Sequence, residues 1–403
     1  MTPPSDAGIG GAGAAPGLTV VFAPDSFKGS LSSVEVARSL ADGWARVRPG
    51  DRLLLAPLAD GGEGTLAAIE AAGGWQRRTA RVLDPGFIEI DAAWLRSSTG
   101  DRAVVELAQA SGLSLVAPAD RHPLDLTTVG TGQLLKAALD AGIRGITLGI
   151  GGSATNDGGG GILEALGARL LDDRGGTTAA GRPSTIPGRF ESIARIDLDG
   201  LDPRLGDVDL RIACDVTNPL LGPTGATAVY GPQKGATEDD RVILEHAVEH
   251  FADALEAATG RRERDTPGAG AAGGVGFGLL CLRDRLRSLE LVPGVDLVAE
   301  ETGLDAKLAM ADIVVTGEGR IDAQTAFGKT ALGVARRARA AGVRCIAVGG
   351  GVEPDGVAAL VALGVEVVPV HELPIAVADA IAAGAAPLVA CGERLGALTT
   401  GPA

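Results

Sequence analysis

The chain has 403 residues, of which 45% are hydrophobic and only 3% aromatic, and it contains 61 glycines. This length suffices for two α/β-sized domains with their own cores. The 51 acidic residues outnumber the 36 basic ones and give a formal net charge of −15. Because a surface of that sign repels a phosphate backbone, the composition argues against nucleic acid as a partner.

The N-terminal segment 1–17 lacks the basic region of a signal peptide, and the chain contains no apolar run of about 18 residues. We therefore expect a flexible tail over 1–17, a soluble cytoplasmic protein and no membrane partner. The four cysteines lie far apart and form no CxxC pair, which argues against a disulfide framework or a zinc site. The sequence leaves the oligomeric state open.

The first elements follow a β-α-β order. Residues 18–23 form a short apolar run rich in β-branched residues, an amphipathic helix follows at about 34–47, and 52–57 is the next strand. Ser32 and Glu35 have the capping-box spacing at the start of the helix. This order predicts a parallel sheet with right-handed crossovers.

The middle of the chain has a different pattern. Between 75 and 108, short alternating segments separated by turn signals favour antiparallel or mixed strand pairing. Beyond them we expect helices at 130–141, at 238–259 and from Ala271, and strands at 145–148 and 209–214.

Strict alternation returns after about residue 290, with strands at 312–317, 344–350 and 365–370 and helices at 329–341 and 354–362. The predicted fold is α/β with two domains. A Rossmann-like parallel α/β domain is built from both chain ends, 18–60 and 288–392. A mixed α/β domain, 61–287, is inserted between them.

Six polar, glycine-containing loops are the candidates for chemistry. Most follow predicted strands, and ligands of open α/β sheets bind beyond the carboxyl ends of strands. Their carboxylates favour Mg²⁺ over zinc, because they are oxygen ligands and the four histidines lie outside the loops. The loops cover 23–30, 58–65, 149–159, 214–226 with 231–237, 267–274 and 316–330, and the carboxylates are Asp25, Asp60, Glu63, Asp157, Asp215, Glu318 and Asp322.

The loop at 149–159 has two competing interpretations. Gly149, Gly151 and Ala154 match a dinucleotide-binding fingerprint after a strand, and the acids at 172–173 stand about where such a fold places its ribose-binding residue. An NAD-dependent oxidoreductase is therefore an alternative. Against it, the four consecutive glycines at 158–161 are poor helix formers.

We favour an anion cradle in this loop, in which backbone N–H groups point at phosphate or carboxylate oxygens. Asn156 and Asp157 would then hold a metal or the substrate. Purely structural glycine turns are the remaining alternative.

The loop at 316–330 ends like a Walker A sequence but fails the motif, because Ala323 stands where glycine is required. The chain has only five lysines, and three of them, Lys28, Lys234 and Lys329, lie beside glycine, where an ammonium suits phosphate contacts. Anion-binding loops, few lysines and many Mg²⁺-suited acids together favour phosphoryl transfer.

Seven blocks resemble, in the same order, those of the bacterial glycerate kinases of the two-domain glycerate 2-kinase type. The resemblance runs from about 18 to 390. It implies an active site in the cleft between the two domains, with ATP and Mg²⁺ as cofactors and D-glycerate as acceptor. The blocks are PDSFKGSLSSVEVA, PLADGGEGT, GIGGSATNDGG, CDVTNPLLG, GPQKGAT, PGAGAAGG and TGEGRIDAQTAFGKT.

The resemblance also supplies the candidate site. We expect Lys28 and Arg320 to face phosphoryl or carboxylate oxygens, and Asp157 or Asp215 to be the base that orients the attacking hydroxyl. The candidates for Mg²⁺ are Asp60, Glu63 and Glu318. The candidates for binding substrate or phosphate are Asp25, Ser26, Gly151, Gly152, Ser153, Asn156, Asn218 and Asp322.

The predicted function is phosphorylation of D-glycerate to 2-phosphoglycerate. A glycerate 3-kinase or another small hydroxy-acid or sugar-acid kinase is the nearer alternative, because a displacement of the bound substrate by about an ångström or two would present the 3-hydroxyl instead of the 2-hydroxyl. A non-catalytic binding module is a more distant alternative.

Overall fold

The computed structural model describes residues 17–176, 185–323, 325, 330–373 and 375–399. Of the expected N-terminal tail only Gly17 is described, and the Walker-like segment 326–329, with Lys329, also lies outside the described residues. No helix in these ranges is long and apolar enough to cross a membrane.

A five-stranded parallel sheet is built from both ends of the chain, as the sequence predicted, in the order β13-β12-β11-β1-β2. The chain passes from β1 to β2 in one direction and from β11 to β13 in the other, so the strand order reverses between β1 and β11. Such a switch point opens a crevice at the carboxyl ends of the two strands. The strands are β1 (Thr19–Pro24), β2 (Arg52–Leu55), β11 (Ile313–Ile321), β12 (Arg344–Val352) and β13 (Glu366–Pro369).

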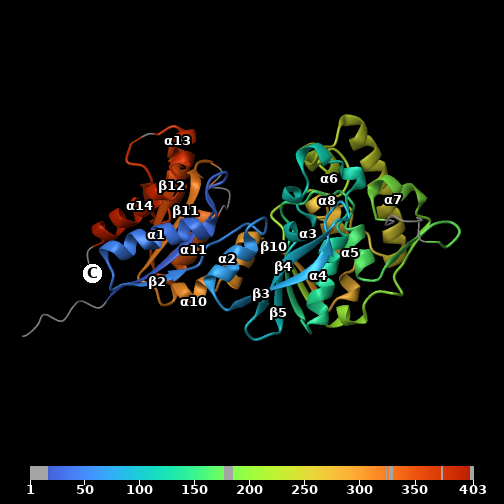
Figure 1. Ribbon diagram of the computed structural model, residues 1–403, viewed down its shortest axis with the longest axis horizontal. Coiled ribbons are helices and arrows are strands. Elements are labelled where there is room, and N and C mark those ends of the chain that lie inside the picture. Colours follow the sequence, from blue (N-terminus) through green and yellow to red (C-terminus); the bar gives the residue numbers. More distant parts are fainter. Residues whose placement is uncertain (1–16, 177–184, 324, 326–329, 374, 400–403) are drawn as a thin grey trace, which may run out of the picture.

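Helices cover both faces of this sheet (Figure 1). On one face α1 (Ser33–Val47) and α14 (Ala386–Leu398) bury Phe22, Leu40 and Trp44. The predicted capping box begins α1, since Ser32 Oγ accepts from the amide of Glu35 and the Glu35 carboxylate accepts from the amide of Ser32 at 2.8 Å. The other face packs against α2 (Thr65–Ala72), α10 (Leu304–Leu308), α11 (Thr330–Ala341) and α12 (Pro354–Val361).

A second, six-stranded sheet has the order β10-β9-β6-β5-β4-β3. The pairs β3–β4 and β4–β5 are antiparallel and the others parallel, which confirms the mixed pairing expected from the sequence. Its strands are β3 (Trp75–Leu83), β4 (Glu89–Ser97), β5 (Arg102–Glu106), β6 (Gly145–Gly149), β9 (Asp209–Ala213) and β10 (Ser288–Val292).

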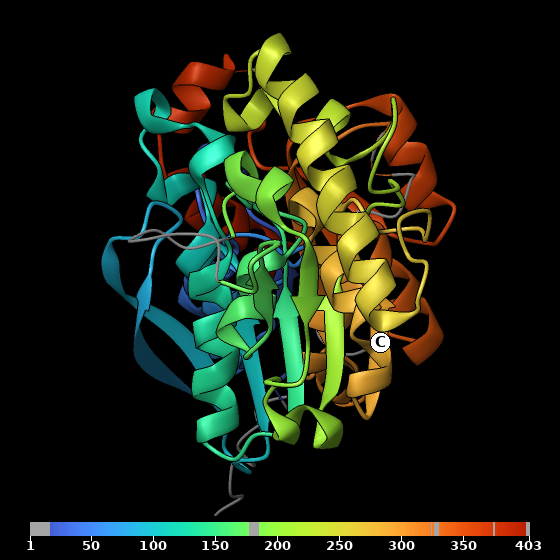
Figure 2. The same cartoon turned by 90° about the vertical axis from the view of Figure 1, so that its right-hand side faces the viewer.

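Figure 2 shows helices in front of one face of this sheet, among them α4 (Val129–Asp140) and α7 (Glu238–Thr259). Together with α5 (Gly160–Ala165) and α8 (Ala271–Cys281) they bury the largest apolar cluster. The other face, at Leu95 and Val104, packs against α2 and α9 (Gly294–Glu301) and joins the core of the first sheet. The remaining elements are α3 (Ala108–Ser111), α6 (Ala226–Tyr230), α13 (Val377–Ala382) and the two-stranded sheet of β7 (Arg169–Leu171) and β8 (Arg195–Asp197).

Two sequence expectations need correction. Strand β7, which carries the acids of the dinucleotide fingerprint at its end, pairs antiparallel with β8 and not with β6. The fingerprint interpretation is therefore wrong, because a dinucleotide fold needs both strands in one parallel sheet. The predicted domain boundary at 288 separates β10 from its partner strand, since β10 pairs with β9 in the six-stranded sheet. The division into two domains stays a prediction.

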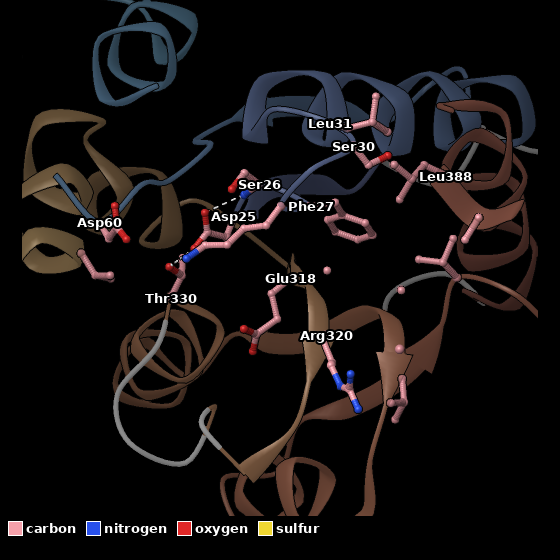
Figure 3. Close-up of a pocket in the computed structure, with 18 of the residues that line it drawn as sticks. Asp25, Ser26, Phe27, Ser30, Leu31, Asp60, Glu318, Arg320, Thr330 and Leu388 are labelled. Atoms are coloured by element: carbon pink, nitrogen blue, oxygen red, sulfur yellow. Dashed lines mark hydrogen bonds between the residues drawn. The ribbon is translucent and has the colours of Figure 1, made fainter. Parts of the chain in front are cut away.

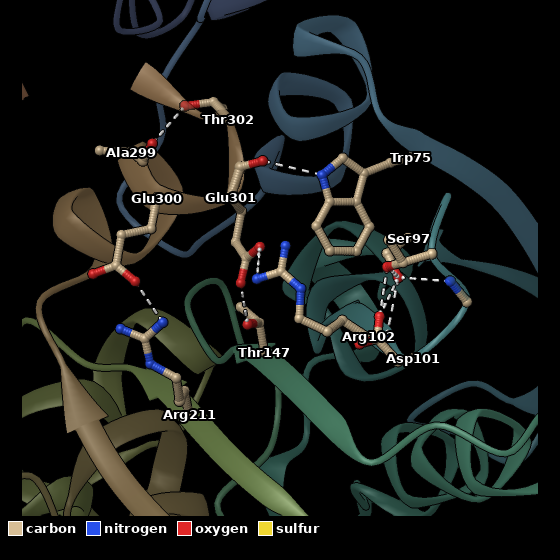
Figure 4. Close-up of polar contacts among 12 residues, drawn as sticks. Trp75, Ser97, Asp101, Arg102, Thr147, Arg211, Ala299, Glu300, Glu301 and Thr302 are labelled. Atoms are coloured by element: carbon tan, nitrogen blue, oxygen red, sulfur yellow. Dashed lines mark hydrogen bonds and ion pairs between the residues drawn. The ribbon is translucent and has the colours of Figure 1, made fainter. Parts of the chain in front are cut away.

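Helix α9 follows β10 and leads towards the first sheet, and its last residue ties it to the six-stranded sheet (Figure 4). Glu301 is buried, accepts from Thr147 Oγ1 at 2.8 Å and pairs with Arg102 at 3.1 Å. The Arg102 guanidinium lies 5.2 Å from the ring centroid of Trp75, whose indole N–H donates to the Glu301 carbonyl. These contacts hold the C-terminal end of α9, in the segment that connects β10 of the six-stranded sheet to β11 of the first sheet, against the six-stranded sheet.

Candidate active site

A cleft of about 1310 Å³ opens at the carboxyl ends of β1, β11 and β12, at the switch point of the five-stranded sheet (Figure 3). Asp215 and Pro293, which follow β9 and β10, add a wall from the six-stranded sheet. Small-molecule sites commonly have about 300–1,000 Å³. The cleft therefore has room for two substrates at once.

Seven of the predicted site residues line this cleft, although they come from four loops that are far apart in the chain. They are Asp25, Ser26, Lys28, Asp60, Asp215, Glu318 and Arg320.

The loop after β1 is held in place by the neighbouring strand and helix. The Asp25 amide donates to the carbonyl of Gly317 at 2.8 Å. The Asp25 carboxylate accepts from the Ser26 amide at 2.6 Å and from Thr330 Oγ1, at the start of α11, at 2.5 Å (Figure 3). Asp25 is thus oriented by groups from both sides of the switch point.

Two glycines let the adjacent strands pass directly beneath this loop. A Cβ on Gly319 would lie 3.2 Å from the Phe27 Cα, and a Cβ on Gly350 would lie 2.7 Å from the Gly319 carbonyl oxygen and 3.3 Å from the Phe27 ring. Larger residues at either position would push the Phe27–Lys28 turn away from β11 and β12.

One wall of the cleft carries three carboxylates, those of Asp25, Asp60 and Asp215. Burial raises the pKa of Asp25 and of Asp215, and the negative charge of Asp60 raises both further. Within the described residues none of the three forms an ion pair with lysine or arginine. This wall therefore has uncompensated negative charge.

The positive charge of the cleft comes from the loop after β1, from the end of β11 and from α11. Lys28 is exposed. The exposed Arg320 guanidinium donates to the carboxylate of Glu353 and lies 3.8 Å from Asp322, and Arg336 lines the cleft from α11. An exposed ion pair such as Arg320–Glu353 is weak, so an anionic ligand can displace Glu353.

Asp157 lies outside the cleft and is fully buried. Its carboxylate accepts from the amide and hydroxyl of Thr128 at 2.7 and 2.8 Å, and from the amides of Gly159 and Gly161 at 3.1 and 3.2 Å. Burial raises its pKa, and these donors act in the opposite direction. Of the two candidates for the base, only Asp215 reaches the cleft.

The loop at 149–159, where an anion cradle was expected, packs closely against other loops of the protein. The Gly151 amide donates to the carbonyl of Gly61 at 3.2 Å, and a Cβ on Gly151 would lie 2.5 Å from the Gly62 Cα. The carbonyl of Gly152 accepts from the amide of Leu113 at 2.8 Å. The glycines serve close contact between loops, so the geometry favours the alternative of structural glycine turns.

Ser153 and Asn156 also lie within the protein rather than in the cleft. Ser153 Oγ accepts from the ammonium of Lys234 at 2.8 Å, and the same ammonium donates to the Thr155 carbonyl at 2.6 Å. Asn156 Nδ2 donates to Thr227 Oγ1 at 3.0 Å. Complete burial lowers the pKa of Lys234 to about 7, although the negative charge of Asp157 opposes this shift.

The remaining candidates have local partners. Asn218 donates to the Thr224 carbonyl at 2.8 Å and accepts from the Tyr230 hydroxyl at 2.7 Å, which shapes its own loop. Glu63 is exposed outside the cleft. Glu318 is buried and accepts from Thr325 Oγ1 at 2.7 Å.

The predicted Mg²⁺ set of Asp60, Glu63 and Glu318 does not assemble. Among the described residues no group of three or more His, Cys, Asp or Glu side chains is arranged to hold a metal ion.

A family model described as "Glycerate kinase family" matches residues 20–400. The chain belongs to the glycerate kinase family. It is 47% identical over 332 residues to a glycerate kinase from Halalkalibacterium halodurans, covering 82% of this chain and 85% of the relative. It is 43% identical to the glycerate 2-kinase of Escherichia coli K12, covering 80% and 82%.

A solved structure agrees with these relatives. A crystal structure from Salmonella typhimurium LT2 that carries the name glycerate kinase 2 superposes with a TM-score of 0.80 at 40% identity, covering 94% of this chain and 98% of that one. The glycerate kinase fold and family membership predicted from the sequence are thereby confirmed, and ATP is the substrate that a kinase family implies.

Several residues of this kinase's cleft escaped the sequence analysis. Thr330, which fixes Asp25, is the last residue of the loop 316–330 and the first of α11, and no role was predicted for its hydroxyl. Glu353, directly after β12, and His371, after β13, lie outside the six glycine-containing loops, yet both line the cleft. Loop composition gave no signal for Glu353 and His371, since they join the other cleft residues only through strand pairing in the first sheet.

Proposed function

We propose that this kinase transfers the γ-phosphoryl group of ATP to the 2-hydroxyl of D-glycerate, giving 2-phosphoglycerate and ADP. The relatives named glycerate kinase, at 43–47% identity over most of the chain, and the E. coli relative named glycerate 2-kinase support this reaction. The observation that carries the proposal is the cleft at the switch point, where a carboxylate wall and exposed cations from separate loops face one space.

Lys28 and Arg320 bind the anionic oxygens of the substrates. Both substrates carry negative charge, as does the protein, so binding depends on the few cations that line the cleft. Lys28 lies in the turn that follows β1, and Arg320 lies at the end of β11, which places them on the two sides of the switch point. Phosphoryl transfer needs little covalent work from the protein, so positioning and charge stabilisation dominate.

Asp215 orients the attacking hydroxyl and accepts its proton. Its carboxylate is fixed by the Gly294 amide at 2.8 Å, which leaves the second oxygen for the substrate. The raised pKa makes it a better proton acceptor than an ordinary exposed aspartate. Asp157 has no role in this step, because it is buried among its own donors.

The carboxylate wall fits a divalent cation. Asp25 and Asp60 lie at one edge of the cleft, and neither forms an ion pair with a lysine or arginine among the described residues. Mg²⁺ commonly takes only one or two carboxylates and completes its shell with water and substrate phosphates, so a preformed cage of three is not required. Asp25 and Asp60 would hold the ion, which would neutralise charge on the phosphates of ATP.

We also propose that the protein is cytoplasmic, where ATP is abundant. We further propose that its two domains fold independently. Limited proteolysis that releases 61–292 as one stable fragment would support the second point. The internal boundary at 292 follows the pairing of β10 with β9.

The decisive experiment is proton-coupled ³¹P NMR of the product formed from purified protein, ATP, Mg²⁺ and D-glycerate. A phosphate on C2 couples to one carbon-bound proton and gives a doublet, whereas a phosphate on C3 couples to two and gives a triplet. A triplet would assign a glycerate 3-kinase. No transfer to glycerate, but transfer to another acid in a panel of hydroxy acids and sugar acids, would contradict the proposed acceptor.

A further inference from the structure

The two ends of the cleft differ in chemistry. One end, next to the six-stranded sheet, carries Asp60, Asp215 and Asp296. The opposite end is formed by apolar side chains from the turn after β1, the ends of β12 and β13, and the helices α13 and α14. We call it the apolar end, and it consists of Phe27, Leu31, Val352, Val370, Ile375, Val377, Ile381 and Leu388.

The apolar end exposes large side chains that a folded chain normally covers. Val377 is 72% exposed, Ile381 43% and Ile375 41%, and helix α13 has no buried residue at all. These side chains do not stand singly on the surface, because they share one wall of the cleft with the buried Val370 and Leu388. A grouped apolar surface within a cleft is typical of a ligand-binding site.

Only one of the two proposed substrates has an apolar part. Glycerate has three carbons that carry a carboxylate and two hydroxyls, so it offers no apolar face to such a wall. The nucleotide has a flat base whose faces are apolar and whose edge carries hydrogen-bonding groups. The Phe27 ring, which points towards the Leu388 side of the cleft in Figure 3, can stack on a base, and the imidazole of His371 offers hydrogen-bonding nitrogens beside it.

We propose that the apolar end of the cleft binds the purine base of the ATP donor, between Phe27 and helix α13. This inference rests on the proposed kinase function. Lys28 follows Phe27 directly in the chain, so a base on the Phe27 ring directs the triphosphate towards Lys28 and the carboxylate wall. Glycerate then occupies the end near Asp215, and the γ-phosphoryl group lies between the two substrates.

The test uses Ile381→Ser in the full-length protein, with steady-state kinetics for each substrate. Because Ile381 is 43% exposed on a helix without buried residues, the variant folds normally. Removing an apolar side chain from a base-binding wall raises KM for ATP by about tenfold. KM for glycerate stays unchanged, and kcat stays within about twofold because the reacting groups are untouched.

Val361→Ser is the matched control. Val361 is 56% exposed on α12 but does not line the cleft, so its kinetics remain those of the wild type. A second readout uses inorganic tripolyphosphate, which has phosphates and no base. In the wild type we expect tripolyphosphate to inhibit competitively against ATP with a much higher inhibition constant than ADP. In Ile381→Ser the inhibition constant of ADP rises and that of tripolyphosphate does not, so the two constants become more similar.

The outcomes separate the two levels of the proposal. If the wild type forms no phosphoglycerate, the kinase function itself fails. If it does, but Ile381→Ser leaves KM for ATP unchanged or raises KM for glycerate instead, the base is bound elsewhere and this inference is overturned. Self-association of the wild type that Ile381→Ser abolishes, with unaltered kinetics, would assign the apolar end to contact between copies and overturn it too.

Discussion

Replacing Asp157 and Asp215 by asparagine, one at a time, distinguishes the roles of two carboxylates that were both candidates for the base. In Asp157→Asn the side-chain NH2 group replaces one of the two carboxylate oxygens and cannot accept a hydrogen bond. It therefore faces donors on one side, either the Gly159 amide or the groups of Thr128 and Gly161, which lose their acceptor. Leaving a buried donor unpaired costs about 1–3 kcal/mol, and each hydrogen bond that loses its charged partner weakens by about 1 kcal/mol. We expect a loss of about 3–5 kcal/mol of stability at neutral pH.

The assay compares unfolding midpoints in urea with turnover of the protein that is still folded. Asp157→Asn lowers the midpoint markedly, and its folded fraction keeps its activity to within a few-fold. Asp215→Asn unfolds like the wild type because Asp215 lines the open cleft, so that only part of its side chain is withdrawn from water, and because its carboxylate accepts from the Gly294 amide through one oxygen. Its kcat falls by about 10²–10⁴-fold, the usual contribution of a general base. A stable but inactive Asp157→Asn protein would refute this reasoning and would indicate a catalytic role for Asp157.

Three further predictions follow from the charged groups. Lys28→Ala lowers kcat/KM by at least about tenfold without changing the unfolding midpoint, and normal turnover would remove Lys28 from the mechanism. Glu353→Gln releases Arg320 from an exposed ion pair and lowers KM for one anionic substrate by about two- to fivefold, whereas a raised KM would contradict the displacement of Glu353. The buried Lys234 has a pKa of about 7, below its ordinary value of 10.5, so between these pH values the unfolded chain binds more protons and stability rises with pH. From pH 7 to 9 the wild type therefore gains stability relative to Lys234→Met, by at most about 1.4 kcal/mol per pH unit, and a pH-independent difference in urea unfolding would contradict the lowered pKa of Lys234.

The local elements were predictable because their signals are local. Helix α7 has the bounds expected from its pattern, 238–259, and the capping box of Ser32 and Glu35 begins α1 as predicted. The alternation of strands and helices at both chain ends predicted the parallel sheet. Its switch point in turn explains why loops with glycine and carboxylates after β1 and β11 face one cleft.

The sequence could not assign strands to sheets or separate surface loops from buried ones. The residues of β10 fell within the predicted first domain, 288–392, but the strand pairs with β9, about 80 residues earlier in the chain. The glycine loop around Asp157 looked like an anion site because glycines and acids also occur in such sites. In the structure Gly149 and Gly151 of this loop lie against Gly61 and Gly62, which favours a structural role for these glycines.

The sequence by itself determined the family, the order of the elements and the set of loops in which the chemistry lies, because these depend on short-range periodicity and on motifs of contiguous residues. Only the tertiary structure decided which carboxylates face solvent, that Asp215 and not Asp157 reaches the cleft, and that α13 gives the cleft an apolar end. Burial and proximity are set by pairings between segments up to about 300 residues apart, such as β1 with β11, and no local pattern encodes them.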